Sequence, residues 1–313
     1  MSTLIDVARR AGVSKSTVSN VIRGASLVAE PTRRRVERAI ADIGYHPNAI
    51  ARALKARTSS AIGIVVPDLA NPFYAELAVS VERAASALGY AVLAAHTECA
   101  PLTEEEAGRA LIERRVDGVV IAGVSLGSSL PGMLLDREIP VVLASFGEPE
   151  DPRLGVIDHD DAAAMEVIVD HLYGLGHRRV AFASQHLREY GGERRRLGFA
   201  SALARRGLAL VELDDGATAV VAHNDMLAIA TIDRLERRGL LVPRDVSVVG
   251  YDDVPLAAHC RIRLTTVRSD AVEMGRRAVE LAVAAAREGR HIALREMQSN
   301  PLVVRSTTQR PPA

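Results

Sequence analysis

A cluster of hydrogen-bonding side chains near the N-terminus is the part of this sequence best suited to chemistry. The cluster consists of Lys15, Ser16, Thr17, Ser19 and Asn20. Side chains of these types donate to phosphate oxygens and bond to the edges of bases in a DNA groove. The cluster therefore indicates a nucleic-acid surface, provided that a rigid element presents these side chains in one direction.

Two short helices joined by a tight turn are expected to present this cluster. Gly12 lies between two runs of helical apolar spacing, where it can adopt the positive φ of a sharp turn. Ser14 is placed to cap the second helix. The expected buried residues are Ile5, Val7, Ala8 and Ala11 in the first helix and Val18, Val21 and Ile22 in the second.

A third helix is expected to complete a small core. It begins at about Pro31 or Thr32 and ends at Ile43, with Glu30 and Thr32 as competing N-caps. An ordinary helical hairpin with a solvated charged face is the alternative interpretation, because a lone helix-turn-helix pattern is not specific. The expected inner face consists of Val36, Ala39, Ile40 and Ile43.

The charge distribution favours the DNA-binding interpretation. The whole chain is neutral, with 39 basic and 39 acidic residues, but residues 1–60 hold 11 Lys and Arg against 4 Asp and Glu. The remainder holds 28 basic and 35 acidic residues. A head of charge +7 on a body of charge −7 is expected when one end of a protein meets a polyanion and the other does not.

Beyond residue 60 the pattern changes to short apolar runs separated by helix-length amphipathic segments. This alternation predicts an α/β body of two lobes, each with a doubly wound parallel sheet covered by helices on both faces. The expected strands are 61–67, 90–95, 118–122 and 141–144 in the first lobe, and 179–183, 217–222 and 245–250 in the second. The expected helices are 74–88, 103–114, 162–175, 193–206 and 225–238.

Polar side chains follow several of these strands. Ligands of doubly wound sheets bind at the carboxyl ends of the strands, so these residues are candidates for a small-molecule site. Carboxylates, amides and an arginine suit vicinal hydroxyl groups. The alternative is that Asp68, Asp225 and Asp252 cap helices or turns, and Asp225 is expected to be a cap. The candidates are Asp68, Asn71, Phe73, Tyr74, Ser145, Phe146, Ser184, Gln185, Arg195, Asn224, Asp225 and Asp252.

Short motifs spread over almost the whole length of the sequence point to one family. They are Ile5-Asp6-Val7-Ala8, Ala11-Gly12-Val13-Ser14, Thr17-Val18-Ser19, Gly44-Tyr45, Pro47-Asn48, Ala51-Arg52, Leu54, Ile62-Gly63-Ile64-Val65-Val66-Pro67-Asp68, Asn71-Pro72-Phe73-Tyr74, Asp117-Gly118-Val119-Val120, Leu175-Gly176-His177, Asn224-Asp225 and Val248-Val249-Gly250-Tyr251-Asp252-Asp253. In these motifs the sequence resembles the LacI/GalR family of bacterial repressors. The resemblance implies a helix-turn-helix domain at 1–46, a hinge helix and linker at 47–60, and a two-lobed effector-binding and dimerisation domain of the periplasmic-binding-protein type at 61–313.

The resemblance implies roles for particular residues. Lys15, Ser16 and Asn20 are expected to contact base edges, while Thr17, Ser19 and Asn48 hold phosphates. In the hinge, Ala51 and Leu54 are expected at the minor groove, with Leu54 wedged between base pairs of a bent operator. The residues that match effector-binding positions of the family are Phe73, Arg195, Asn224 and Asp252, and Asp68 and Tyr74 join them by their place after the first strand.

One segment departs from the family pattern. Between the helix that ends near 206 and the strand 217–222, the family has a further strand with its covering helix, whereas here only residues 208–216 remain. Loss of this helix is expected to remove a loop that borders the effector cleft in the family, and to uncover apolar sheet surface unless neighbouring structure or a partner subunit covers it. The segment leaves two interpretations open. Either a sugar-like or nucleoside-like effector controls the protein, or the shortened lobe responds to no small molecule or to a protein instead.

Other classes of protein fit the sequence poorly. Cys99 and Cys260 lie far apart without metal-ligand spacing, and neither His159 nor His223 accompanies a nucleophile or a zinc motif, so we expect no enzyme, metal or cofactor. A transported-solute receptor would share the two lobes but carry an export signal in place of the basic head. With no apolar run of membrane-spanning length, we expect a cytoplasmic, nucleoid-associated homodimer on double-stranded operator DNA.

Overall fold

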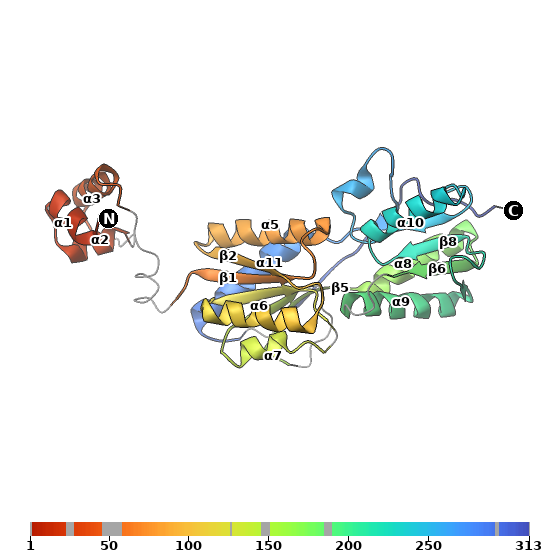
Figure 1. Cartoon of the computed structure of the whole chain (residues 1–313), viewed down its shortest axis with the longest axis horizontal. Coiled ribbons are helices and arrows are strands. Elements are labelled where there is room, and N and C mark those ends of the chain that lie inside the picture. The colour runs from red at the N-terminus through yellow and green to blue at the C-terminus, as the bar shows by residue number, and fades with distance from the viewer. Residues whose placement is uncertain are drawn as a thin grey trace. The chain divides into compact units, whose positions relative to one another are not determined.

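The computed structural model describes residues 2–22, 28–45, 58–125, 127–144, 151–184, 190–291 and 294–312. The chain forms two compact units, Met1–Ser59 and Ser60–Ala313, here called the head and the body (Figure 1). No helix among the described residues is long and apolar enough to cross a bilayer.

The head consists of three short helices, α1 (Leu4–Ala11), α2 (Lys15–Ile22) and α3 (Glu30–Asp42). Thr3 and Asp6 form a reciprocal capping box at the start of α1, and Gly12 ends this helix with φ 62°. Ser14 Oγ accepts a hydrogen bond from the Thr17 amide at 3.1 Å, which confirms Ser14 as the cap of α2. The buried core of the head consists of Val7, Ala8, Ala11, Val18, Val21, Val36, Ala39 and Tyr45.

The start of α3 differs from the prediction. The N-cap is Ala29, which makes no side-chain capping bond, and Glu30 is already helical. Pro31 explains the difference, because it has no amide hydrogen and its fixed φ suits the first helical turn, so a side-chain cap is less needed there. Glu30 instead accepts a hydrogen bond from Arg34 at 3.0 Å along the helix surface.

Lobe 1 of the body has a six-stranded parallel sheet in the order β11-β5-β4-β3-β1-β2. Alternate residues of its central strands face opposite layers of helices, as a parallel sheet buried on both faces requires. Helices α5 and α11 cover one face, and α6 and α7 cover the other (Figure 1). The bounds are β1 (Ala61–Val66), α5 (Pro72–Ala87), β2 (Ala91–His96), α6 (Pro101–Glu113), β3 (Gly118–Ala122), α7 (Leu130–Leu135), β4 (Val141–Ala144), β5 (Gly155–His159), α11 (Ala271–Glu288) and β11 (Arg295–Gln298).

Lobe 2 has a smaller parallel sheet in the order β7-β6-β8-β9. Helices α8 and α9 pack on one face of this sheet and α10 packs on the other. A short antiparallel pair, β10 with β12, lies beside it. The bounds are α8 (Asp161–Leu175), β6 (Arg179–Ala183), α9 (Tyr190–Arg206), β7 (Ala209–Leu210), β8 (Ala219–Ala222), α10 (Asp225–Arg237), β9 (Ser247–Val249), η1 (Pro255–Ala258), β10 (Thr266–Val267) and β12 (Leu302–Val303).

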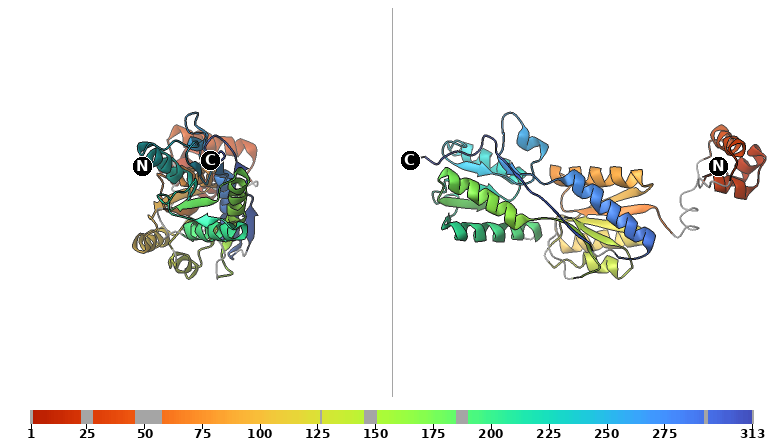
Figure 2. Two further views of the ribbon diagram at one scale, coloured as in Figure 1. Left: turned by 90° about the vertical axis from the view of Figure 1, so that its right-hand side faces the viewer. Right: turned by 180° about the vertical axis from the view of Figure 1, so that it is seen from behind.

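The two lobes are not consecutive halves of the chain. After β10 the chain returns to lobe 1 to form α11 and β11, and it then crosses back to lobe 2 as β12 and the C-terminal tail (Figure 2). The expected α/β class and two lobes are confirmed. The patterns did not indicate β5, α7, α11 or β11, and the strands predicted at 217–222 and 245–250 are shorter in the structure.

The shortened segment of lobe 2 is closed by its own loop. Residues 211–218 are all described and lead from the edge strand β7 to β8 without a helix. Val211 and Leu213 pack against the α10 side of the sheet, and Asp214 is paired with Arg234 at 3.3 Å and with Arg238. Neighbouring structure therefore covers this sheet face at Ala181 and Val220, which are 2% and 0% exposed.

Candidate functional site

The expected DNA-binding face lies on the outer side of α2. Lys15 and Ser16 are exposed, and Thr17, Ser19 and Asn20 are half-buried, while Val18 and Val21 anchor the opposite side of the helix in the core of the head. Ser14 Oγ lies 2.7 Å from Ser16 Oγ and 2.8 Å from Thr17 Oγ1, which fixes the start of this surface. Asn48, Ala51 and Leu54 lie outside the described residues.

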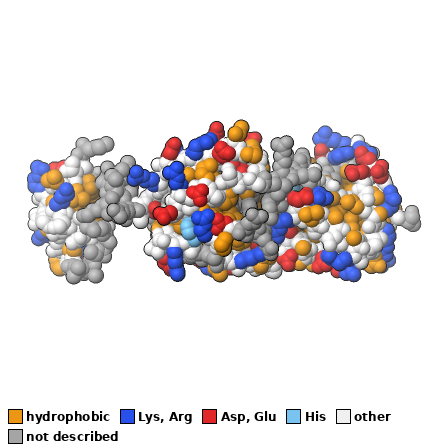
Figure 3. All heavy atoms as spheres, turned by 90° about the horizontal axis from the view of Figure 1, so that it is seen from below, with side chains coloured by type: hydrophobic (Ala, Val, Ile, Leu, Met, Phe, Trp, Pro, Cys, Tyr) orange, Lys and Arg blue, Asp and Glu red, His pale blue; other side chains and the backbone are white. Residues whose placement is uncertain are grey.

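Several cations of the head are engaged within the head itself. Arg9 pairs with Asp6 at 2.8 Å and Arg10 with Asp42 at 3.0 Å, whereas Lys15 has no ion pair or hydrogen bond among the described residues. Basic side chains predominate on the visible described part of the head, and both signs are interspersed over the body (Figure 3). An unpaired lysine at the N-terminal end of an exposed helix is placed to meet an anion.

Arg195 on α9 organises the carboxyl end of the lobe 2 sheet. Its side chain is buried and donates to Asp161 at 3.2 Å and to the His223 carbonyl at 3.0 Å. Its guanidinium lies 3.8 Å from the centre of the Tyr251 ring, and Asp252 is 3.9 Å away. Burial opposes ionisation of Asp161, but Arg195 and Arg194 outweigh it and lower the pKa of this carboxyl.

Arg194, the preceding residue, reaches from lobe 2 to lobe 1. It donates to both carboxylate oxygens of Asp158 at 3.0 Å and to the His159 carbonyl at 3.0 Å. Asp158 is fully buried at the end of β5, and this burial raises its pKa against the opposing effect of Arg194. Charge-assisted hydrogen bonds from Arg194 therefore join the two lobes close to the point where the chain first passes from lobe 1 to lobe 2, after β5.

His159 presents unused hydrogen-bonding capacity at the lobe junction. Burial lowers its pKa to about 4, so the ring is neutral at pH 7. Asn300 Nδ2 lies 3.2 Å from His159 Nδ1, and in this assignment Nε2 carries the ring hydrogen. His159 Nε2, Asn300 Oδ1 and Ser184 Oγ are buried without hydrogen-bond partners in the described structure. Buried polar atoms of this kind suit the groups of a polar ligand.

The structure brings together some of the predicted effector-binding residues. Arg195 and Asp252 adjoin each other in lobe 2, and Phe73 and Tyr74 form an edge-on ring pair with centroids 5.2 Å apart in lobe 1. The buried Phe73 ring lies 6.5 Å from the His159 ring, which places it at the junction. Asp68 is exposed and accepts a hydrogen bond from the Ala70 amide at 2.7 Å within a turn, as the capping alternative predicted.

Asp225, which is expected to cap a helix or a turn, does not cap α10. Asn224 caps α10 by accepting from the Leu227 amide at 2.8 Å. Asp225 is fully buried in the first turn, where it accepts hydrogen bonds from the Val254 amide at 2.8 Å and from Thr266 Oγ1 at 2.5 Å. Burial raises its pKa to about 7. Its carboxyl therefore joins two loops of lobe 2 rather than the end of a helix.

Three residues that were predicted to border the junction, Ser145, Phe146 and Gln185, lie outside the part of the chain that the structure describes.

Five further residues build the junction, although the sequence patterns did not single them out. A buried carboxylate at a strand end and an arginine on a later helix carry no sign that they meet, because their contact depends on how the lobes pack. The five residues are Asp158, Asp161, Arg194, Tyr251 and Asn300.

A helix-turn-helix head joined to a two-lobed α/β body with a polar junction defines a class of ligand-responsive DNA-binding proteins. Family comparisons agree with this class. Residues 3–48 match the bacterial regulatory proteins of the lacI family, and residues 59–216 match the periplasmic binding proteins and sugar binding domain of the LacI family. Residues 169–308 match a periplasmic binding protein-like domain. The chain belongs to the LacI family of DNA-binding transcriptional regulators.

Individual relatives cover almost the whole chain. It is 32% identical to the HTH-type transcriptional repressor PurR of Photobacterium profundum over an alignment of 333 positions, which covers 99% of each chain. It is 33% identical to the transcriptional regulator DegA of Bacillus subtilis, with 88% of each covered. The structure of the lac repressor dimer bound to operator and the anti-inducer ONPF superposes with a TM-score of 0.87 at 26% identity, covering 98% of this chain and 99% of that one.

A complex of the regulator CelR with cellobiose is also similar, with a TM-score of 0.71 at 29% identity over 98% of this chain and all of that one. These likenesses confirm the expected family, fold and DNA-binding class. They do not favour the alternative of a regulator that has lost its small-molecule response.

Proposed function

We propose that this protein is a dimeric repressor that binds a pseudo-palindromic operator and is controlled by a small polar effector at the lobe junction. The observation that carries the proposal is the set of buried, unpartnered polar atoms of His159, Asn300 and Ser184. A body that served only for dimerisation would have no use for such a set.

The head supplies the operator contacts. Lys15, Ser16 and Asn20 contact base edges in the major groove, and Thr17 and Ser19 hold phosphates. The exposure of Lys15 and Ser16 and the buried anchors of α2 support this assignment. In the hinge, 47–60, Asn48 holds a phosphate while Ala51 and Leu54 enter the minor groove.

The effector lies between Phe73 and Tyr74 of lobe 1 and Arg195, Asn224 and Asp252 of lobe 2. A ring and an arginine–carboxylate pair fit a sugar-like or nucleoside-like molecule, which offers an apolar face and several hydroxyl or ring-nitrogen groups. The similar structure of a complex with cellobiose supports a sugar-like ligand. Asp68 is the weakest member of the predicted set, because its carboxylate is already used within its own turn.

Control follows from the link between the lobes. An effector that contacts both lobes can bind one arrangement of the lobes more tightly than another. It then shifts the population toward that arrangement by an amount set by the difference between the two affinities. That shift changes the spacing of the two N-terminal lobes in a dimer and so the order of the paired hinge helices. The same coupling requires that operator binding changes effector affinity by an equal factor. The protein acts as a regulator rather than an enzyme, in the cytoplasm at the nucleoid.

The proposal is tested by thermal-shift screening of the full chain against sugars, nucleosides and nucleobases. A ligand that raises the melting temperature is then added to a fluorescence-anisotropy titration with operator DNA. The expected result is a change of at least fivefold in operator Kd. No ligand effect on either measurement would leave the protein without an effector and overturn the proposal.

A further inference from the structure

The chain contains only two lysines, and both fall within the first sixty residues. They are Lys15 and Lys55, so 37 of the 39 basic residues are arginines. Residues 61–313 hold 28 arginines and no lysine. A guanidinium stays protonated in proteins, whereas the primary amine of lysine is the usual target of acyl groups. Every lysine amine that an acyl donor can modify therefore belongs to the DNA-binding part of the chain.

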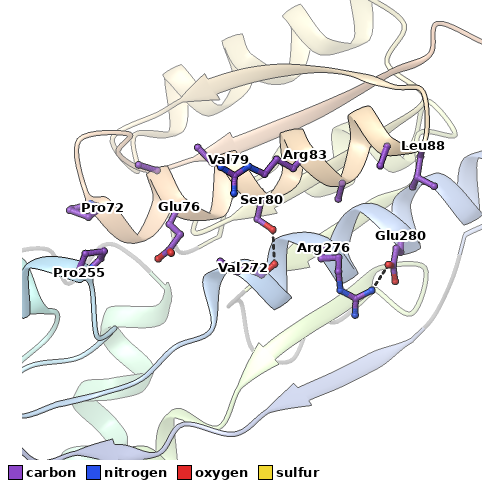
Figure 4. Close-up of a pocket in the computed structure, with 13 residues that line it drawn as sticks. Pro72, Glu76, Val79, Ser80, Arg83, Leu88, Pro255, Val272, Arg276 and Glu280 are labelled. Carbon is purple, nitrogen blue, oxygen red and sulfur yellow. Dashed lines mark hydrogen bonds and ion pairs between the residues drawn. The ribbon is translucent and has the colours of Figure 1, made fainter. Parts of the chain in front are cut away.

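The body presents arginine even where its surface is hollowed. A groove of about 770 Å³ runs between α5 and α11, and its cationic lining residues are Arg83 and Arg276 (Figure 4). Arg276 is paired with Glu273 at 2.5 Å and with Glu280. A reagent that acylates lysines consequently finds no target in this groove.

The amine of Lys15 is open to a reagent from solvent. Lys15 is the first residue of α2, its side chain is exposed, and no ion pair or hydrogen bond engages it among the described residues. Other cations of the head are engaged, because Arg34 donates to Glu30 at 3.0 Å and Arg35 donates to the Gly12 carbonyl at 3.3 Å. Lys55 lies in the hinge, outside the described residues.

The surroundings of Lys15 favour an anionic reagent. The first turn of α2 contains no acidic residue, and residues 1–60 carry a charge of +7. The nearby hydroxyl groups of Ser14, Ser16 and Thr17 bond to one another at 2.7 and 2.8 Å, and hydroxyls without a general base are weak nucleophiles. An acyl phosphate joins a reactive carbonyl group to an anionic phosphate, so its charge matches this surface.

We propose that Lys15 is a site of acylation by acyl phosphates, and that this modification releases the head from DNA. The neutral amine attacks the carbonyl carbon of the donor. A nitrogen–carbon bond forms, and the bond from that carbon to the phosphate oxygen breaks. Phosphate leaves with the electron pair, the nitrogen gives one proton to solvent, and the product is an uncharged amide.

Acylation of Lys15 removes a positive charge from the surface expected to meet DNA. The fold of the head should survive, because Lys15 is not part of its core and a cation at the N-terminal end of α2 opposes the helix dipole. This inference rests on the proposed operator binding. It adds a second input, which acts on the head and leaves the effector-binding lobes unmodified because they contain no lysine.

Two variants isolate the effect of Lys15. Lys55→Arg leaves Lys15 as the single lysine, and the double variant K15R/K55R, which has none, is the matched control. Each protein is incubated with acetyl phosphate, and mass spectrometry of its peptides locates the acetyl groups. Full acetylation of Lys15 in the first variant should raise its operator Kd at least tenfold over the value before treatment. The operator Kd of K15R/K55R should change less than twofold on the same treatment.

Operator DNA should also protect Lys15. Saturating operator is expected to slow acetylation of Lys15 in the Lys55→Arg protein at least fivefold, and circular dichroism melting should show that the acetylated protein stays folded. An unmodified Lys15, or an unchanged operator Kd after its full modification, would overturn the proposal. A Lys55→Arg protein that is acetylated at Lys15 but binds no operator before treatment would count against the proposed function, while the acylation site itself would stand.

Discussion

Arg194 and Asp158 join the two lobes of the body through two hydrogen bonds of 3.0 Å, one to each carboxylate oxygen. Asp158 is fully buried, and its other cationic neighbour, Arg295, is 3.8 Å away. Arg194→Met leaves the buried carboxylate with only this distant cation and the His159 amide, which donates to it at 2.8 Å, so the free energy of unfolding should fall by about 3 kcal/mol. Urea denaturation of the full chain measures this loss.

The neighbouring Arg196 provides the control for this experiment. It pairs with Glu193 at the surface, and Arg196→Met should cost less than about 1 kcal/mol. If R194M and R196M lose the same small amount, Arg194 does not anchor the junction. A double variant D158N/R194M should recover part of the loss, because no buried charge remains unpaired.

The buried carboxyl of Asp225 predicts a dependence of stability on pH. Its pKa is raised from 3.8 to about 7 by burial, so the folded state holds a proton that the unfolded state has already released. Stability from this group is fully present below pH 4 and is lost as pH rises from about 4 to about 7. Asp225→Asn keeps an oxygen that accepts from the Val254 amide, and its NH2 group can donate to Thr266 Oγ1, so this variant should be less sensitive to pH across this window.

Comparison of urea unfolding at pH 4.5 and 7.5 measures this dependence. With roughly 1.4 kcal/mol for each pKa unit, the original chain should lose about 3 kcal/mol more than D225N between these values, because roughly 2.5 pH units separate pH 4.5 from the raised pKa. The low pKa of His159 acts in the opposite direction, since stability is lost as pH falls from about 6.5 to about 4. His159 is present in both proteins, so the difference between them isolates Asp225. Parallel pH profiles would contradict the assignment.

Local patterns predicted the head and most strands and helices of the body, but not the junction between the lobes. Gly12, Ser14 and the apolar stripe of α2 act through neighbours a few residues away, so their spacing predicted the head. Residues that follow strands, such as Asp252, could be predicted as site residues because a parallel sheet places the carboxyl ends of its strands at one edge. The Arg194–Asp158 contact joins residues 36 positions apart in two different lobes, and no periodicity encodes it.

The same limit applies to the shortened segment of lobe 2. The length of the segment 208–216 was enough to show that a helix is missing. It did not show that Val211 and Leu213 pack against the sheet and cover it. Leu213→Asp should detach this loop and lower the free energy of unfolding by about 2 kcal/mol. Increased binding of an apolar dye to the folded protein should accompany it. Leu210→Asp, on the exposed edge strand, is the control and should change neither quantity.

The hinge makes a separate prediction about DNA. Leu54→Ala removes the apolar wedge expected between base pairs, so specific operator affinity should fall by at least tenfold while nonspecific affinity changes less than twofold. Anisotropy titrations with operator and with random duplex at the same salt concentration measure both values. Equal losses on the two duplexes would show that Leu54 is a linker residue.

The effector site predicts a variant that binds DNA but responds poorly. Asp252 lies 3.9 Å from Arg195 at the end of the lobe 2 sheet and is nearly buried. Asp252→Asn keeps the size of the side chain but weakens its acceptance of ligand hydroxyl groups, so effector Kd should rise by about tenfold, a change of about 1.4 kcal/mol. Operator Kd without effector should stay within twofold, because the head is untouched. Asp245→Asn, a half-buried carboxylate paired with Arg244 before the start of β9, should alter neither constant. If D252N and D245N respond to the effector alike in calorimetry, Asp252 is a structural residue, and the ligand contacts of lobe 2 must come from Arg195 and Asn224.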